Sequence, residues 1–272
     1  NGKCYFYAST QSQSAVVEPL AELLGIESEN VCMISENTGG GFGSKGRVYP
    51  TMAITGRFSQ LLNRPVQLRI TREEEYYLGV GRPGMQGWVK TGVRADGTVA
   101  AVDVIIISDG GPTGRNSASS SAQHISVVYT PTAMRLRNIP VFTNTAPRGA
   151  QRGPGQNEMS AAIAPIMDIA ARELGMDRAQ FRRVNAPHSE SPVYEHQGPV
   201  TSAFMAEAID MATAMFNWTE REAAPRQRNG SKIRGLGVGL GYHAAGGNGY
   251  DGLVRITPDG RIHLHNGVGN LG

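Results

Sequence analysis

The stretch "VCMISENTGGGFGSKG", residues 31–46, joins an apolar run to a turn that has five glycines in its last eight residues. The apolar run predicts a buried strand, and "RVYPTMAITGRFSQLLN" (47–63) predicts a helix after the turn. A turn with so few side chains can bring bare backbone N–H groups close to a ligand. A phosphate is the first candidate, because N–H groups between a strand and a helix can surround an anion.

The neighbouring segments continue this alternation of helices and strands. "VVEPLAELLG" (16–25) has helical apolar spacing and a closing glycine, and "PVQLRIT" (65–71) alternates like a strand. "MQGWVKTGVRA" (85–95) and "TVAAVDVIIIS" (98–108) predict a hairpin around Asp96-Gly97, which argues against a purely parallel sheet. We therefore expect an α/β fold of the mixed α+β kind, with layered mixed sheets and helices.

The second half of the chain predicts more elements and a change of domain. Residues 110–130 are small and polar and predict a long surface loop, whereas "AMRLRNIPVFTNT" (133–145) predicts a strand. The polar "APRQRNGSK" (224–232) indicates a linker before glycine-rich strands, so we expect a domain boundary near residue 230. Helices are expected at residues 159–175, 177–185 and 199–218.

The composition is that of an ordered protein, with 40% hydrophobic and 18% charged residues among 272. The formal charge of +3 is scattered along the chain, which disfavours nucleic acid as a partner, and no apolar run approaches the ~18 residues of a membrane span. Two cysteines, Cys4 and Cys32, cannot form a disulfide framework and fit a reducing, cytoplasmic location. The chain begins within the strand-like "KCYFYAST" and stops in a glycine turn, so we expect a piece of a longer polypeptide.

Several catalytic patterns fail in this sequence. The nucleotide-binding pattern G-x-x-x-x-G-K-[ST], counted from Gly39, has Ser44 and Gly46 at two of its fixed positions, which disfavours an ATP-hydrolysing enzyme. His263 and His265 can share one side of a strand as a metal pair, but no third ligand accompanies them. A phosphate-like group beside the glycine turn remains open, as does a turn that serves packing alone.

A second loop rich in backbone donors, residues 147–157, also precedes a helix. Together with it, three further motifs resemble the molybdopterin-binding subunit of the molybdenum hydroxylases, the xanthine dehydrogenase and aldehyde oxidase family. The four motifs are "STQSQSA" (9–15), "GGGFGSKG" (39–46), "NTAPRGAQRGPGQNE" (144–158) and "MDIAARELGMDRAQFRRVN" (167–185). The resemblance implies that residues 1–230 form a first molybdopterin-binding domain and residues 231–272 the incomplete start of a second one.

The resemblance also implies how the cofactor is held. In this family the molybdenum is bound by the dithiolene of its pterin, and the protein contacts it from outside, without side-chain ligation of the metal. Gln11 would offer its amide to the apical oxygen, and Phe42 and Gly43 would offer backbone N–H groups, flanked by Gly40 and Gly41. Arg152 matches an arginine beside cofactor and substrate. The simpler alternatives are a helix-capping role for Gln11 and a surface salt bridge for Arg152.

The substrate positions depart from the purine-specific members of the family. Gly46 stands where those members have a carboxylate, and Pro154 where they have a stacking aromatic residue, so purine oxidation is not expected. The family's catalytic base is a glutamate that would lie beyond Gly272, and no catalytic residue is assigned within the chain.

The implied function is oxidation of an aldehyde or a heteroaromatic C–H group with oxygen from water. The cofactor would be molybdenum-molybdopterin, with the cytosine dinucleotide form as one candidate. Electrons would pass to [2Fe–2S] and FAD groups on an iron–sulfur subunit and an FAD subunit, since two cysteines cannot hold a cluster. Further partners would be the rest of the molybdopterin subunit and a small-molecule substrate. The alternative is a noncatalytic cofactor-binding or interaction fragment of such a complex.

Overall fold

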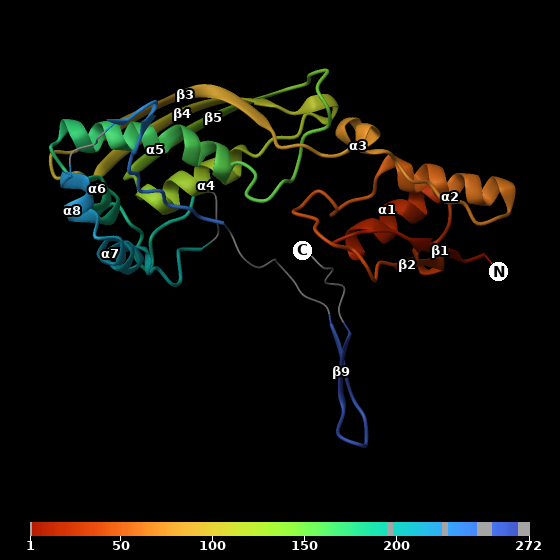
Figure 1. Cartoon of the computed structure of the whole chain (residues 1–272). Helices are drawn as coiled ribbons and strands as arrows, with labels where there is room; N and C mark the ends of the chain where they lie inside the picture. The colour runs from red at the N-terminus through yellow and green to blue at the C-terminus, as the bar shows by residue number, and fades with distance from the viewer. Residues whose placement is uncertain (1, 195–197, 225–227, 244–251, 266–272) are drawn as a thin grey trace. The chain divides into compact units, whose positions relative to one another are not determined.

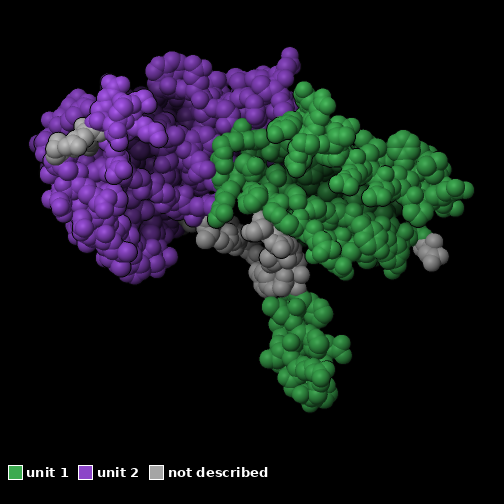
Figure 2. Space-filling model, in the orientation of Figure 1, with its two compact units in different colours: residues 1–82, 149–152, 245–272 green, residues 83–148, 153–244 purple. Residues whose placement is uncertain are grey.

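The computed structural model describes residues 2–194, 198–224, 228–243 and 252–265. Its chain forms two compact units (Figure 2). Unit 1 comprises residues 1–82, 149–152 and 245–272, and unit 2 comprises residues 83–148 and 153–244. Both units combine helices with strands, so the predicted mixed fold class is confirmed. The predicted division into two molybdopterin-binding domains at residue 230 remains a prediction.

Unit 1 is built on two parallel strands, β1 (Cys4–Tyr7) and β2 (Val31–Ile34), with α1 (Ser14–Leu24) as the crossover between them. As predicted, α1 ends at a glycine, whose φ of 67° is left-handed. α2 (Pro50–Leu62) begins at the predicted proline and packs on α1, where a Cβ on Gly56 would lie 2.6 Å from Leu24 Cδ2. The core of this unit consists of Phe6, Leu20, Ala21, Leu24 and Val31.

The predicted strand at 65–71 is wrong. Its residues are mostly exposed and pair with no strand among the described residues, and alternation predicts a strand only where one face is buried. Instead Thr71 starts a short helix, α3 (Arg72–Leu78), through a capping box in which its hydroxyl accepts from the Glu74 N–H. The Thr-x-x-Glu spacing is visible in the sequence and predicts this helix start.

Unit 2 contains a three-stranded mixed sheet. β3 (Gly84–Val93) and β4 (Val99–Asp109) form the predicted antiparallel hairpin, and β5 (Ala133–Val141) lies parallel to β4. Alternate residues of β4 are buried, and α4 (Ala118–Tyr129) and α5 (Gln156–Glu173) cover that face of the sheet (Figure 1). The core therefore lies between the sheet and these two helices, and it includes Val102, Val104, Ile106, Ile125, Ile163 and Met167.

The prediction of a surface loop at 110–130 is wrong, because α4 is one of the most buried elements. Its small side chains allow close packing against the start of α5, where a Cβ on Gly155 would lie 2.2 Å from the Ser117 carbonyl oxygen. The Ser121 hydroxyl donates to the Gly155 carbonyl at 3.0 Å, so this buried polar group has a hydrogen-bond partner inside the protein. His124 is also buried, and burial lowers its pKa to about 4, which keeps the ring neutral.

Ion pairs fasten α6 (Arg178–Val184) to the rest of unit 2. Arg182 is fully buried and its Nη1 lies 2.7 Å from Oδ1 of Asp168 on α5. Arg178 pairs with Glu222 at 2.7 Å and donates to the Leu236 carbonyl at 3.0 Å. Asp177 caps the helix as predicted, accepting from the N–H groups of the second and third helical residues. α6 thus connects α5, the chain around 222 and the chain around 236.

The C-terminal part of the described chain departs from the sequence prediction in two places. The helix expected at 199–218 begins later, as α7 (Met205–Phe216), and a left-handed Asn217 separates it from α8 (Trp218–Ala223). The segment 234–243, expected to contain a glycine-rich strand, belongs to no strand among the described residues. A Cβ on its glycines would meet nothing within 4 Å, so close approach to another backbone does not explain them.

Two hairpins and two short 3-10 turns complete the described elements. Two of the strands expected after residue 231 are present as β8 and β9, which form an antiparallel hairpin with Val254, Ile256, Ile262 and Leu264 on one face. No helix among the described residues is long and apolar enough to cross a membrane. The remaining bounds are β6 (Arg228–Asn229), β7 (Lys232–Ile233), β8 (Leu253–Ile256), β9 (Ile262–His265), and 3-10 turns at Ser28–Asn30 and Gly111–Thr113.

A carboxylate at the end of β4 fixes the chain that follows β5. Asp109 accepts from the Thr143 hydroxyl, the Gly111 N–H (3.0 Å), the Thr145 hydroxyl (3.0 Å) and Arg148 Nε (3.1 Å). These donors, with Thr143 first, lower the pKa of Asp109 from 3.8 to about 2. The residues immediately before the 149–152 segment are therefore held by one charged group.

This depressed pKa predicts a pH-dependent contribution to stability. The carboxylate stabilises the fold fully above pH 3.8, and the contribution is lost as the pH falls towards 2, because the unfolded chain takes up the proton first. At pH 7, Asp109→Asn should lower the free energy of unfolding by about 2 kcal/mol, measured by urea denaturation. The difference from the wild type should shrink between pH 4 and pH 2, and an equal difference at both ends would contradict the assignment.

Candidate functional site

The residues 39–46, called here the glycine loop, are held against the N-terminal segment by one glutamine. Gln11 Oε1 accepts from the N–H of Gly43 at 2.9 Å and from the N–H of Lys45 at 3.3 Å. The Gln11 backbone N–H also donates to the Lys45 carbonyl at 3.1 Å. Because the carboxamide oxygen is fixed in this way, the direction of its NH₂ group is fixed too, and that group has no acceptor among the described residues. Gln11 caps no helix: α1 has Gln13 at its N-cap position.

Close contacts explain three of the loop's glycines. A Cβ on Gly41 would lie 2.3 Å from Gln11 Oε1, and a Cβ on Gly40 would lie 2.7 Å from the Phe42 ring. Gly43 has a φ of 98°, and its Cβ would lie 3.0 Å from the Cβ of Ala150. Gly46 is different, because its Cβ would meet only ordinary contacts, the nearest being the Gly43 carbonyl oxygen at 3.4 Å.

The backbone donors of the glycine loop fall into two groups. The N–H groups of residues 43–46 are all used within the site, two by Gln11 and two by the carbonyls of Gly41 and Gly43. The N–H groups of Gly39, Gly40, Gly41 and Phe42, called here the donor row, have no acceptor among the described residues. Gly41 is buried, Gly40 is half-buried, and Gly39 and Phe42 are exposed, so the donor row lies at the surface of the unit. Successive backbone N–H groups at such a position are suited to an oxygen-rich or anionic ligand.

The second loop supplies its first residues to the same unit. Besides the contact of Ala150 with Gly43, the Gly149 N–H donates to the Gly81 carbonyl at 3.1 Å. The Arg152 carbonyl accepts from Arg82 Nη2 at 2.8 Å. The side-chain oxygen of Gln151 is buried without a hydrogen-bond partner among the described residues. Residues 149–152 thus lie beside the glycine loop.

The structure therefore brings together most of the residues that the sequence singles out. Gln11, Gly40, Gly41, Phe42, Gly43 and Gly46 form one cluster, and Arg152 belongs to a segment that contacts this cluster. Pro154 belongs to unit 2. The predicted catalytic base beyond Gly272 lies outside the chain.

Two buried threonines belong to the site and were not predicted from the sequence. Thr38, which precedes the glycine loop, donates through Oγ1 to the carbonyls of Thr10 and Ser35, both at 3.1 Å. Thr10 donates through Oγ1 to the Lys45 carbonyl at 2.9 Å. These hydroxyls connect both ends of the glycine loop to the segment that carries Gln11. Their only signal in the sequence is their position next to the motifs.

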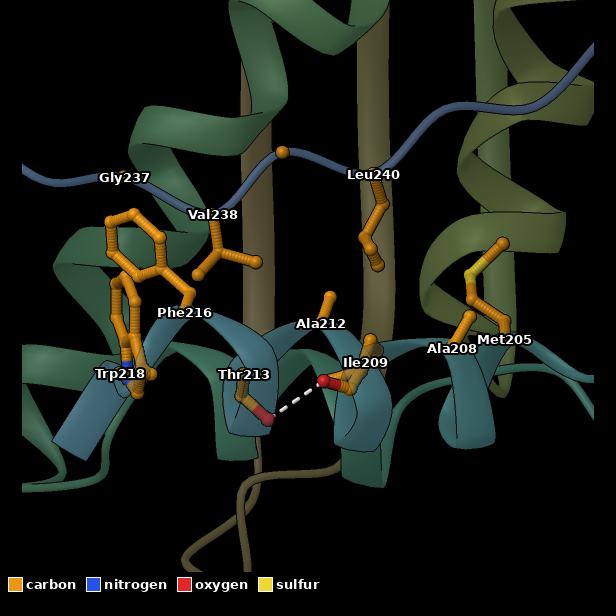
Figure 3. A pocket seen from close by; sticks show the side chains of 11 residues that line it. Met205, Ala208, Ile209, Ala212, Thr213, Phe216, Trp218, Gly237, Val238 and Leu240 are labelled. Carbon is orange, nitrogen blue, oxygen red and sulfur yellow. Dashed lines mark hydrogen bonds between the residues drawn. The ribbon is translucent and has the colours of Figure 1, made fainter.

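An apolar groove of about 460 Å³ in unit 2 is a second place where a ligand could bind. Figure 3 shows side chains of α7 and α8 on one side and the segment 237–240 on the other. Thr213 supplies the one hydroxyl of the lining, and that hydroxyl donates to the Ile209 carbonyl of its own helix at 2.7 Å. The groove has no titratable group in its lining, so it offers no acid, base or nucleophile for a reaction.

The sequence model of the molybdopterin cofactor-binding domain matches residues 1–186, which include the whole glycine loop, Gln11 and Arg152. The chain belongs to this family. It is similar to a probable xanthine dehydrogenase subunit of Bacillus subtilis, with 30% identity over 96% of this chain and 36% of the relative. It is also similar to the 6-hydroxypseudooxynicotine dehydrogenase complex subunit gamma of Paenarthrobacter nicotinovorans, with 27% identity over 93% of this chain and 34% of that protein.

Solved structures agree with this assignment at the level of the fold. The aldehyde oxidoreductase of Desulfovibrio gigas superposes with a TM-score of 0.84 and 24% identity, over 97% of this chain and 29% of that chain. This molybdopterin cofactor-binding chain spans about a third of the length of the two curated relatives. The resemblance inferred from four short motifs is confirmed.

The hydrogen-bonding groups of the site fit a molybdenum-pterin cofactor. The donor row and the Gln11 NH₂ group are hydrogen-bond donors without acceptors among the described residues, and such a cofactor is rich in oxygen acceptors. A Cβ at Gly40 or Gly41 would displace the Phe42 ring or the Gln11 carboxamide that lie beside these donors. The residues that would hold the group are therefore Gln11, Gly40, Gly41 and Phe42. In the present geometry the Gly43 N–H is already used by Gln11, so its part is to orient that side chain.

Proposed function

We propose that this chain is part of the catalytic subunit of a molybdenum hydroxylase and that its glycine loop holds the molybdenum-pterin cofactor. The observation that carries the proposal is the donor row beside the fixed carboxamide of Gln11. When bound, the cofactor supplies a two-electron oxidation and an oxygen that comes from water. The chain's own residues bind and orient it: Phe42 and Gly41 through backbone N–H groups, and Gln11 through its NH₂ group.

The proposed substrate is an aldehyde or a heteroaromatic compound oxidised at a C–H group. Gly46 supports a substrate other than a purine, because the position has room for a side chain but offers no carboxylate. Pro154 supports the same inference, since its ring cannot stack as an aromatic residue does. Arg152 is proposed to lie beside cofactor and substrate. The general base is proposed to be a glutamate beyond Gly272.

The electrons are proposed to leave through [2Fe–2S] and FAD groups on an iron–sulfur subunit and an FAD subunit. The names of the two curated relatives support a multi-subunit assembly, because each relative is itself named as one subunit of a dehydrogenase.

Cys32 is in register with Tyr5, the residue after Cys4, so the two cysteines point to opposite faces of the β1–β2 pair. Both are free thiols, which supports the cytoplasmic location proposed for the complex.

The decisive measurement is the metal and pterin content of the purified native complex. We expect one molybdenum and one pterin per chain, together with the visible absorption of iron–sulfur and flavin groups. Reduction of an artificial dye by a panel of aldehydes and N-heterocycles should then identify the substrate class. A complex without molybdenum or pterin would contradict the proposed function, and one that holds both without oxidising any substrate would favour the noncatalytic alternative.

A further inference from the structure

A single cation closes the neck of the glycine loop. Lys45, at the end of the loop, donates through Nζ to the carbonyl of Thr38, the residue before the loop begins, at 2.8 Å. The same Nζ donates to Ser9 Oγ at 2.8 Å, and that hydroxyl donates to the Thr38 carbonyl at 2.6 Å. The two ends of the loop are therefore joined by a side chain that is itself half-buried.

The ammonium group of Lys45 is bound by neutral oxygens and by no carboxylate among the described residues. A half-buried charge that meets only a carbonyl and a hydroxyl keeps much of its positive potential, since these dipoles do not neutralise it. Exposed ion pairs elsewhere in the described chain, such as Arg183–Asp210, combine a cation with an anion. The glycine loop thus carries one positive charge at its neck, without a counter-charge in the described part of the chain.

This charge acts on the donor row through one peptide bond. The Thr38 carbonyl and the Gly39 N–H are the two ends of the same peptide group, and Gly39 is the first residue of the donor row. A cation at the carbonyl oxygen withdraws electron density from the peptide and strengthens the N–H at the other end as a donor. Lys45 therefore both fixes the position of the row and makes its first member a better donor for an anion.

We propose that Lys45 is a positioning residue that makes the glycine loop selective for a negatively charged oxygen group of the cofactor. This rests on the proposed function. The anionic group is either the phosphate ester of the pterin or an oxygen ligand of the molybdenum, because both present charged oxygens to N–H donors. Lys45 acts through the Thr38–Gly39 peptide and through the closed neck of the loop.

The test compares three variants of the native complex: Lys45→Met, Lys45→Arg and Ser9→Ala. Lys45→Met keeps the apolar stem and removes the charge, and it should lose molybdenum and pterin about 10-fold faster after dilution. The rate for the wild type should rise with salt concentration, and that dependence should be flatter in Lys45→Met. Lys45→Arg should restore most of the retention, and Ser9→Ala should stay near the wild type because the charge and the Thr38 contact remain.

Two arms separate the sources of the anion. Complex prepared without cofactor is heated with inorganic phosphate or with molybdate, and the midpoint of unfolding is recorded for the wild type and Lys45→Met. If phosphate stabilises the wild type but not Lys45→Met, the anionic group is the phosphate ester of the pterin. If molybdate stabilises the wild type but not Lys45→Met, the anionic group is an oxygen ligand of the metal. Protection by neither anion, or equal protection in both proteins, overturns the proposal. The proposal is also overturned if Lys45→Met retains molybdenum as well as the wild type does and with the same dependence on salt. In that case the proposed function still stands, provided that the wild type holds molybdenum.

Discussion

Gly41→Ala should give a folded protein that releases its molybdenum about 100-fold faster than the wild type. The new Cβ would lie 2.3 Å from Gln11 Oε1, so the two cannot keep their positions. The least costly response is rotation of the flexible Gln11 side chain, which breaks its hydrogen bonds with the N–H groups of Gly43 and Lys45. The fold survives that movement, but the Gln11 NH₂ group no longer points at the cofactor.

The matched control is Gly46→Ala, the same substitution five residues along the same loop. Its Cβ would meet the Gly43 carbonyl oxygen at 3.4 Å, an ordinary contact, so molybdenum retention should stay within about 2-fold of the wild type. Molybdenum per chain is measured by mass spectrometry after gel filtration, and circular dichroism checks the fold. Equal retention in both variants would show that Gln11 does not position the cofactor. If Gly41→Ala does not fold, the substitution acts on the stability of the protein and not on cofactor retention.

Asp168→Ala should lower the free energy of unfolding of unit 2 by about 3 kcal/mol. The substitution leaves the guanidinium of Arg182, which is fully buried, without its ion-pair partner at 2.7 Å. Arg182 would keep only neutral partners among the described residues: the Tyr129 side chain and the backbone carbonyls of Arg178 (3.1 Å) and Ala164 (3.5 Å). An uncompensated charge in the interior costs more than the ion pair contributes when it is intact.

Asp210→Ala on the neighbouring pair provides the comparison. Arg183 follows Arg182 on α6, but its pair with Asp210 is about half exposed and screened by water, so its loss should cost much less than the loss of Asp168. The double variant Arg182→Met with Asp168→Ala should be more stable than Asp168→Ala alone, since it removes the buried charge. Chemical denaturation monitored through tryptophan fluorescence measures all three. A double variant less stable than the single one would contradict the charge argument.

The sequence predicted elements whose signals are local. Gly25 and Asn63 end their helices in left-handed conformations, and Asp96-Gly97 turns the hairpin, because each of these residues favours its backbone geometry by itself. α4 was missed because serines at helical positions indicate a loop until a partner satisfies them, as the Gly155 carbonyl does for Ser121. The strand prediction for residues 65–71 is wrong for the opposite reason. Its polar and apolar residues alternate as in a strand, but no neighbouring strand among the described residues pairs with it.

The candidate site likewise contains residues that local motifs predict and residues that depend on long-range contacts. Gln11, Gly40, Gly41, Phe42, Gly43 and Arg152 were predicted as cofactor-binding residues through motifs of known spacing, and the structure places them in one unit. Thr10 and Thr38 could not be recognised as part of the site, because the hydrogen bonds that join Thr10 to Lys45 and Thr38 to Thr10 connect residues about 30 positions apart. The contact of Ala150 with Gly43 was equally hidden, since it depends on how the chain returns to unit 1.

That return has a consequence for how the protein is made. The chain leaves unit 1 after residue 82 and first contributes to it again at residues 149–152. During synthesis the glycine loop therefore emerges from the ribosome well before Ala150, its neighbour roughly a hundred residues later. The loop must wait for this long-range closure, which is slow compared with local folding. The proposed cofactor site is therefore complete only after residue 150 has been synthesised.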